Sequence, residues 1–212
     1  MTDKITFYTH PMSRGRIVRW MLEETGQPYD TQVVDYGEAM KAPDYLAINP
    51  MGKVPAIRHG DTVVTECAAI CAYLADAFPD AQLAPAVSDR LRGPYYRWLF
   101  FAAGPLEAAT TNHALEFKLP PDRQAMAGYG SLSDVLSVLE QELSGRDYIV
   151  GDSFTAADLY LSAHVGWGMQ FGTIDKRPVF ESYHERCTAR PAAERANDKD
   201  NALMPEHPHP SA

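Results

Sequence analysis

The hydrophobic pattern changes character near residue 80. Before that point, short runs of β-branched and aromatic residues alternate with segments of helical periodicity. The predicted elements, in chain order, are a strand at 5–9, a helix from Ser13, a strand at 29–34, an irregular stretch at 35–50, a strand hairpin at 54–58 and 62–65, and a helix at 66–78. This order indicates a small α/β domain over residues 1–80.

Beyond a proline-containing linker at 79–85, the pattern predicts helices and no strand. The expected helices cover residues 88–119 with a kink at Gly104-Pro105, 131–143, 155–169 and 178–190. From Glu194 the chain is polar and ends in EHPHPSA, so we expect a frayed or disordered tail. Residues 81–212 are therefore predicted to form an all-helical domain with a flexible C-terminal tail, and the fold class is α/β plus all-α.

Charge narrows the choice of partners. The formal net charge is −9, and acidic residues exceed basic ones on both sides of residue 80. Such a chain repels nucleic acid and anionic lipid, because neither half offers a basic surface. We expect neither nucleic acid nor a membrane as the partner.

Cysteine usage and the N-terminus indicate the compartment. The three cysteines are odd in number, and Cys67 and Cys71 lie four residues apart on one helix face, which makes a poor disulfide. The N-terminus has no apolar core of a secretory signal, and no apolar run reaches membrane-spanning length. We predict a cytoplasmic protein in a reducing environment.

The first segment with candidate chemistry is TFYTHPMSRGRIVRWMLEE, residues 6–24. A strand ends here, a proline turns the chain, and a helix begins near Ser13. The free N–H groups and dipole of a helix start favour an anion such as a thiolate, to which the Ser13 hydroxyl could donate a hydrogen bond. The alternative is that Ser13 only caps the helix.

The second segment is NPMGKVPAI, residues 49–57. Pro55 stands in an apolar run beside a turn, and a cis bond before it would turn the backbone of Val54 outward. An extended peptide could then pair with that backbone as it pairs with a sheet edge. The alternative is an edge-strand proline without a ligand.

The third segment is TECAAI, residues 65–70, again a strand end followed by a helix start. Free N–H groups at Glu66 and Cys67 could hold a carboxylate, and the Glu66 carboxylate could accept from a ligand ammonium. The alternative is that Glu66 only compensates the helix dipole.

Together these segments resemble the cytosolic glutathione transferases, from Ile5 to about Pro191. The family's Asn-Pro-x-Gly-x-Val-Pro run is residues 49–55, and its Glu-Ser-x-Ala-Ile run is residues 66–70, with Cys67 in place of serine. The run GDSFTAAD at 151–158 also matches, and we interpret it as a helix cap rather than a site. The resemblance implies a thioredoxin-like N-terminal domain, an all-helical C-terminal domain and a homodimer.

By that resemblance, the Val54 backbone pairs with the cysteinyl part of glutathione, with Pro55 cis. Glu66 and Cys67 would hold the γ-glutamyl end. The glycyl carboxylate would be paired by cations, namely Lys53 and Lys41. Both lysines could equally be solvated surface charges, as surface lysines usually are.

The chain departs from the family where the thiolate is held. Many members have serine or tyrosine just before the proline that follows the first strand, and this chain has His10. Ser13 is the first choice as hydrogen-bond donor to the thiolate, His10 the second, and Thr9 a further hydroxyl alternative. Arg14 would lower the pKa of the thiol by its charge.

The resemblance implies an enzyme that adds glutathione to a small hydrophobic electrophile, a detoxification reaction that needs no metal. Several alternatives remain, because chemistry is decided by the site rather than by the fold. They are a glutathione-dependent disulfide reductase or peroxidase, a glutathione-dependent isomerase or dehalogenase, and a non-enzymatic binding or regulatory protein of the same fold.

Overall fold

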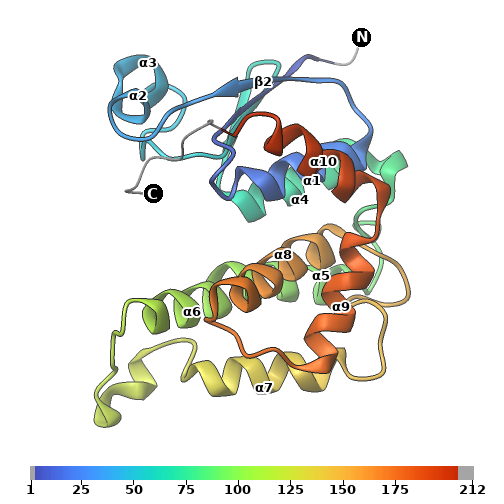
Figure 1. Ribbon diagram of the computed structural model, residues 1–212. Helices are drawn as coiled ribbons and strands as arrows, with labels where there is room; N and C mark the ends of the chain where they lie inside the picture. The colour runs from blue at the N-terminus through green and yellow to red at the C-terminus, as the bar shows by residue number, and fades with distance from the viewer. Residues whose placement is uncertain (1–2, 205–212) are drawn as a thin grey trace. The chain divides into compact units, whose positions relative to one another are not determined.

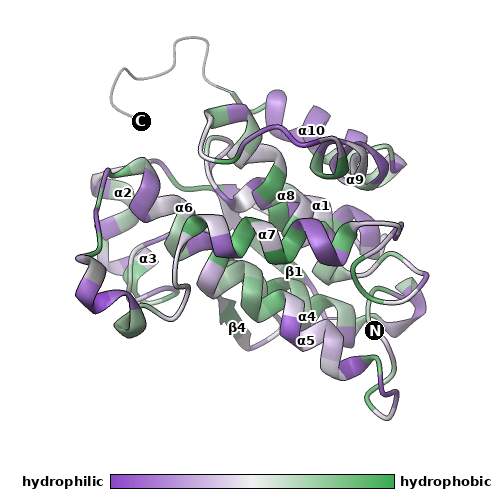
Figure 2. Ribbon diagram, turned by 90° about the horizontal axis from the view of Figure 1, so that it is seen from below, coloured by the Kyte–Doolittle hydropathy of each residue, from purple (hydrophilic) through white to green (hydrophobic). Residues whose placement is uncertain are grey.

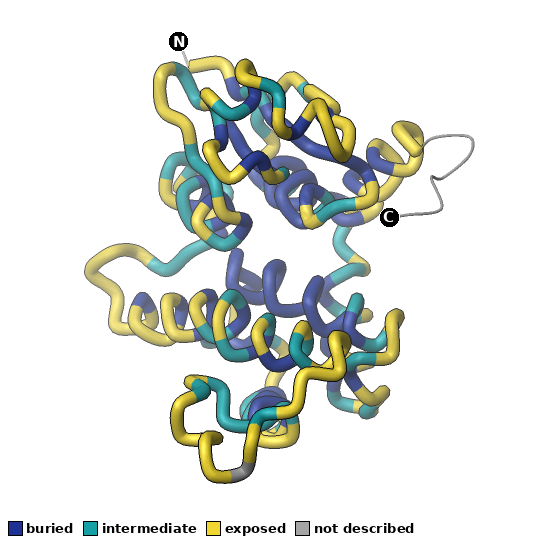
Figure 3. The backbone as a smooth tube through the Cα atoms, turned by 90° about the vertical axis from the view of Figure 1, so that its left-hand side faces the viewer, coloured by how far each residue is buried: buried dark blue, intermediate teal, exposed yellow. Residues whose placement is uncertain are grey.

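The computed structural model describes residues 3–204 of the 212-residue chain. The chain forms two compact units (Figure 1). One combines Met1–Leu83 with Arg190–Ala212, and the other is Ala84–Ala189. Figure 3 shows buried residues inside both units and exposed residues on the outer turns and loops. Within residues 3–204, no helix is long and apolar enough to cross a membrane.

The first unit contains a four-stranded sheet in the order β2-β1-β3-β4. The strands are β1 (Ile5–Thr9), β2 (Tyr29–Val33), β3 (Ala56–His59) and β4 (Thr62–Thr65). β1 pairs parallel with β2 and antiparallel with β3, and β3 pairs antiparallel with β4. The accompanying helices are α1 (Gly15–Thr25), α2 (Glu38–Lys41), α3 (Pro43–Leu46), α4 (Cys67–Ala77) and the short 3₁₀ helix η1 (Pro79–Ala81). The predicted order of strands and long helices is confirmed.

Alternation along β1 gives the sheet two packed faces. Tyr8 joins a cluster of buried residues that the loop helices contribute, with Met40 from α2 and Tyr45 from α3. Phe7 lies on the opposite face, where its ring meets that of Tyr29 and the guanidinium of Arg19 in α1. α1 and α4 pack against each other through apolar stripes of helical spacing. The fold of this unit is thioredoxin-like, as expected.

The prediction of a frayed tail from Glu194 is wrong for the residues that follow it immediately. α10 (Pro191–Asn201) is a regular helix that packs along α1 in the first unit. Figure 2 shows how hydrophilic α10 is, and its buried side chains are three alanines and Asp200. Ion pairs hold α10 against α1. A search for apolar stripes in the sequence does not detect such pairs. The end of the predicted tail, residues 205–212, lies outside the described residues.

The second unit is helical, and its described residues contain no strand. Its elements are α5 (Arg92–Phe101), the π-helical η2 (Ala102–Leu106), α6 (Glu107–Ala114), the 3₁₀ helix η3 (Pro121–Met126), α7 (Leu132–Leu143), α8 (Ala156–Phe171) and α9 (Pro178–Thr188). α8 is the central helix, since most of its residues are buried.

Two further local predictions need correction. The stretch 35–50, predicted irregular, contains the one-turn helices α2 and α3. The helix predicted over 88–119 starts at Arg92 and ends at Ala114, and its expected kink at Gly104-Pro105 is a π-helical segment. Pro105 has no N–H to donate, so the regular hydrogen-bond ladder cannot run through it.

Candidate functional site

The three segments singled out in the sequence meet at one edge of the sheet. Tyr8 of β1 faces Ala56 of β3, and Ala56 faces Thr65 of β4. Extending these registers by two residues places the end of β1, the start of β3 and the end of β4 together. One side-chain contact joins the first and third segments directly: the Cys67 thiol donates to the Arg14 carbonyl at 3.7 Å.

His10 follows β1 directly and is 8% exposed. The backbone N–H of Met12 donates to His10 Nδ1 at 3.2 Å, so Nδ1 carries no proton and the neutral ring holds its proton on Nε2. Burial lowers the pKa of His10, and the charge of Asp35 acts in the opposite direction. The His10 ring packs 4.4 Å from the ring of Tyr36, centroid to centroid. His10 is therefore a neutral group with one N–H donor.

Ser13 is half-buried, and its hydroxyl takes part in the turn before α1. The hydroxyl donates to the His10 carbonyl at 2.7 Å and accepts from the Gly15 N–H at 2.9 Å. Ser13 thus orders the turn, but the N-cap position of α1 belongs to Arg14, whose side chain makes no capping hydrogen bond. Arg14 is exposed and stands immediately before α1.

Thr9 is fully buried, and its hydroxyl lies 3.5 Å from the His10 carbonyl. A Cβ at position 15 would come within 1.9 Å of the Thr9 oxygen, so Gly15 is the residue that lets α1 approach β1 this closely. Thr9 thus fills space between the strand and the helix.

The loop before β3 is held by side chains that sequence reasoning missed. The Lys53 carbonyl accepts from the Tyr45 hydroxyl at 2.6 Å and from the Asn49 amide at 2.8 Å. Burial, and beside it the Tyr8 hydroxyl, raises the pKa of Tyr45 to about 12, so Tyr45 remains a donor. Asn49 is 3% exposed and belongs to the NPMGKVP run. The motif drew attention to this run, but it does not show that the Asn49 side chain is buried and holds the loop.

Val54 follows that loop, and the Val54–Pro55 peptide bond is cis, as expected. Val54 is half-buried, while Pro55 and Ala56 are buried. Across residues 3–204, neither the N–H nor the C=O of Val54 has a hydrogen-bond partner. An unpaired backbone donor and acceptor on one residue is what an extended peptide ligand can pair with.

The two lysines behave differently. Lys41 donates to the carbonyls of Met51 at 2.8 Å and Gly52 at 3.3 Å, so it ties α2 to the loop. Lys53 is exposed. Both bring positive charge to the loop that precedes Val54.

Glu66 stands at the start of α4 with φ 66° and ψ 117°, a backbone conformation that a residue with a side chain rarely adopts. It is exposed, and its side chain makes no capping hydrogen bond. Cys67, the first residue of α4, is 8% exposed. Backbone strain of this kind concentrates at binding sites, where it holds groups in position for a ligand.

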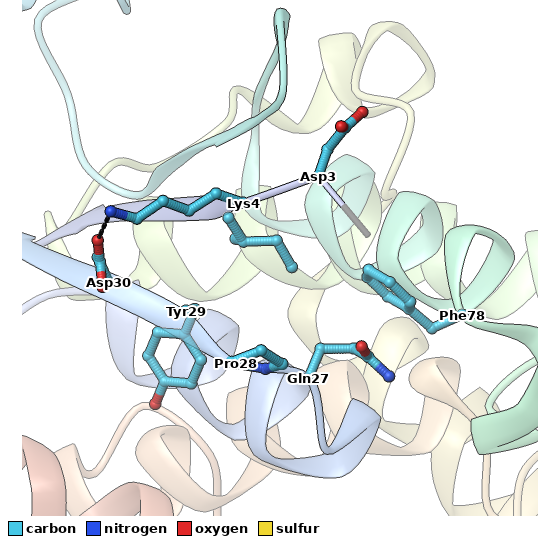
Figure 4. A pocket seen from close by; sticks show the side chains of 8 residues that line it. Asp3, Lys4, Gln27, Pro28, Tyr29, Asp30 and Phe78 are labelled. Carbon is cyan, nitrogen blue, oxygen red and sulfur yellow. Dashed lines mark ion pairs between the residues drawn. The ribbon is translucent and has the colours of Figure 1, made fainter. Parts of the chain in front are cut away.

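A pocket of about 250 Å³ opens at the opposite end of the sheet. Figure 4 shows it between the starts of β1 and β2, with Phe78 from the end of α4 and an ion pair of Lys4 with Asp30 at its rim. None of the predicted site residues lines it.

Comparison with known proteins agrees with this arrangement. The models for the glutathione S-transferase N-terminal and C-terminal domains match residues 12–77 and 107–191. Glutathione S-transferase GST-4.5 of Xanthomonas campestris is 30% identical over 189 residues, which is 86% of this chain and 92% of the relative.

Solved structures show the same similarity. A glutathione transferase from Methylococcus capsulatus has 31% identity and a TM-score of 0.78, covering 93% of this chain and 99% of its own. A sphingomonad glutathione S-transferase complexed with glutathione has 29% identity and a TM-score of 0.74, covering 92% and 98%. The fold and the sheet edge define a thioredoxin-like unit joined to a helical one. The chain belongs to the glutathione S-transferase family of enzymes.

Proposed function

We propose that this protein binds glutathione at the sheet edge formed by His10, Val54 and Glu66, stabilises its thiolate, and transfers it to a small hydrophobic electrophile. The observation that supports this most directly is the unpaired backbone of Val54 beside the starts of α1 and α4. Relatives that carry the name glutathione S-transferase, and a structural neighbour solved with glutathione, point to the same ligand.

In this proposal the cysteinyl part of glutathione pairs with the N–H and C=O of Val54, next to Pro55. The γ-glutamyl carboxylate binds the N–H groups of Glu66 and Cys67, and the Glu66 carboxylate accepts from the ligand ammonium. Lys53 pairs with the glycyl carboxylate. Lys41, which already holds the loop, adds a second positive charge.

The thiolate lies near the turn that carries His10, Ser13 and Arg14. His10 Nε2–H is a donor that the ring's own contacts leave available in the neutral state. Ser13 can donate to a thiolate only by giving up its bond to the His10 carbonyl. We therefore place His10 ahead of Ser13 as donor, with Ser13 shaping the turn and Arg14 favouring the thiolate by its charge.

The reaction follows from this placement. The thiol proton leaves to solvent when glutathione binds, because the site favours the thiolate. The sulfur lone pair forms a new S–C bond to the electrophile, and the electron pair of the bond that breaks moves onto the leaving group or onto the acceptor conjugated with that carbon. No protein side chain needs to hold the thiol proton.

Binding calorimetry followed by turnover assays tests the proposal. Wild type is expected to bind glutathione and to conjugate a panel of hydrophobic electrophiles. His10→Ala is expected to lower the rate about 30-fold and to raise the apparent thiol pKa, whereas His10→Gln, which keeps an N–H donor, retains more activity. Ser13→Ala lowers stability and affects the rate less than His10→Ala.

Several outcomes would contradict these assignments. Absence of glutathione binding by the wild type overturns the proposed function, and a larger rate loss for Ser13→Ala than for His10→Ala reverses the donor order. Turnover of a peroxide or a mixed disulfide alone would replace transfer by reduction. The burial of the three cysteines, none of them at the start of α1, weighs against that reading.

We further propose a homodimer, a cytoplasmic location and a role in detoxification. Tyr96 and Phe100 on α5 are 40% and 71% exposed, and their rings contact each other, which supports a surface that a second copy covers. Sedimentation at micromolar concentration tests the dimer, since a species of only 23.5 kDa would refute it.

A further inference from the structure

In the turn before α1, side-chain hydrogen bonds add to backbone bonds that span three residues, such as that from the Ser13 N–H to the His10 carbonyl at 3.0 Å. Gly15 is the first residue of α1, so its N–H has no acceptor within the helix. Here the Gly15 N–H donates to the Ser13 hydroxyl instead. Three successive carbonyls in this turn are each bound by a side chain: His10 O by Ser13, Pro11 O by Arg16, and Met12 O by Tyr36.

Arg16 is the side chain among these that extends the contact to a distant part of the chain. Its Nε–H donates to the Pro11 carbonyl at 2.6 Å, and its terminal NH2 group donates to Asn201 Oδ1 at 2.9 Å. Asn201 is the last residue of α10, 185 positions further along the chain. One planar guanidinium thus spans the turn and the C-terminal helix.

The rest of α10 fixes Asn201 in place. Figure 1 shows α10 alongside α1, and three sets of ionic contacts join them. Arg190 makes a bidentate pair with Glu24 at 2.7 and 2.8 Å, Glu23 accepts from Arg195 and Lys199, and Asp200 pairs with the buried Arg19 at 2.6 Å. Asp200 also experiences the charge of Arg16, so the end of α10 meets two cations.

We propose that Asn201 and Arg16 are positioning residues for the glutathione thiolate, acting together through the Pro11 carbonyl. We name the three residues Pro11, Arg16 and Asn201 the α10 brace. The brace holds the carbonyl next to His10, and with it the turn in which Met12 N–H fixes the His10 tautomer. The inference rests on the proposed function, because it assigns a role at that same site.

The test compares two ends of one interface. Asn201→Ala removes the acceptor from the brace without altering Arg16, and Asn201→Asp keeps an acceptor oxygen there. Glu24→Gln is the matched control, because it weakens the pair with Arg190 at the far end of α10. All three variants and the wild type are measured by amide hydrogen exchange, glutathione binding, pH–rate profile and thermal unfolding.

Asn201→Ala is expected to speed amide exchange over residues 12–16 about tenfold, to raise KM for glutathione about threefold, and to shift the pH–rate profile to higher pH. Asn201→Asp is expected to restore all three. Glu24→Gln is expected to lower the unfolding temperature while leaving exchange over residues 12–16 and the pH–rate profile at wild-type values.

Unchanged exchange in Asn201→Ala overturns the proposal, and so does an equal effect of Glu24→Gln on the pH–rate profile. The hydrogen-exchange measurement needs no ligand. If wild type binds no glutathione, the proposed function fails, the assignment to thiolate positioning fails with it, and exchange still decides whether the brace orders the turn.

Discussion

Two helix starts in this protein carry an acidic residue and use it in opposite ways. At the start of α8, Asp158 is fully buried and accepts from four donors: Ile149 N–H, Thr155 N–H, the Thr155 hydroxyl and the Tyr183 hydroxyl. At the start of α4, Glu66 is exposed, caps nothing with its side chain, and has a strained backbone. The start of α8 is a capping box, in which the chain's own side chains satisfy the first N–H groups of the helix.

The contrast distinguishes a helix start that the protein's own groups fill from one that the proposed function assigns to ligand binding. Burial raises the pKa of Asp158, and the donors around it act in the opposite direction, so its environment is fully occupied by the protein's own groups. At the α4 start the Glu66 side chain makes no capping hydrogen bond, and the proposed function assigns its carboxylate to the ligand ammonium. Substitutions at the two positions should therefore have different readouts, stability at α8 and glutathione binding at α4.

The largest expected effect is on stability at α8. Asp158→Ala leaves several buried donors without an acceptor and should lower the free energy of unfolding by about 4 kcal/mol. Denaturant unfolding measures it. Asp134→Ala is the control, since Asp134 accepts from Ser131 in the exposed cap of α7 and should lose only about 0.5–1 kcal/mol. Equal losses for both variants would break the comparison.

The second effect concerns the start of α4, where one substitution should raise stability and lower glutathione affinity. Glu66→Gly relieves the strain of φ 66° and should raise the free energy of unfolding by about 1 kcal/mol, while glutathione affinity falls about tenfold or more. Glu66→Ala keeps the strain and should lose affinity without gaining stability. Calorimetry and denaturant unfolding on both variants check this, and a Glu66→Gly protein that binds as well as wild type would contradict it.

A smaller effect is expected from Cys67→Ser. A hydroxyl is a better donor than a thiol, so glutathione affinity should rise about threefold. The serine has a single hydroxyl hydrogen, so it must leave the Arg14 carbonyl, which the thiol meets at 3.7 Å, in order to donate to the ligand. Weaker binding by this variant, measured by calorimetry, would show that Cys67 does not act as a donor to the ligand.

The smallest effect is a pH dependence of stability that arises from His184 in α9, whose ring contacts the Ser162 carbonyl of α8. Burial lowers the pKa of His184, and the Ser162 carbonyl and Glu185 act in the opposite direction. Because the unfolded chain then binds protons more readily, stability should fall as pH drops through about 6.5, the ordinary value for histidine, and level off below the folded pKa. His10 contributes with the same sign. Unfolding of wild type and His184→Gln between pH 7.5 and 5.5 isolates the His184 share, and parallel curves would contradict it.

The strands, the long helices and the three site segments could be predicted from the sequence, because local periodicity or a turn residue marks each of them. Sequence reasoning missed α10, whose docking depends on ion pairs such as Arg190 with Glu24, 166 positions apart. Charge pairing over such distances leaves no periodic pattern. It also missed α2 and α3, each a single turn and too short to show a helical period.

At the site, the motifs located Val54 and Glu66 but not the state of the groups around them. The Ser13 hydroxyl could be read as a donor to a ligand or as a cap, and only three-dimensional contacts show it bonded to His10 and Gly15. Likewise, the tautomer of His10 depends on the Met12 N–H, a contact within the turn that residue types do not encode.

The return of α10 to the first unit has a consequence for how the chain is made. Arg19 is synthesised 181 residues before its partner Asp200. On a ribosome, the sheet and α1 emerge first, then the whole helical unit, and only then the helix that neutralises the buried guanidinium. The first unit begins to fold early, but it is completed only after the whole helical unit has been synthesised.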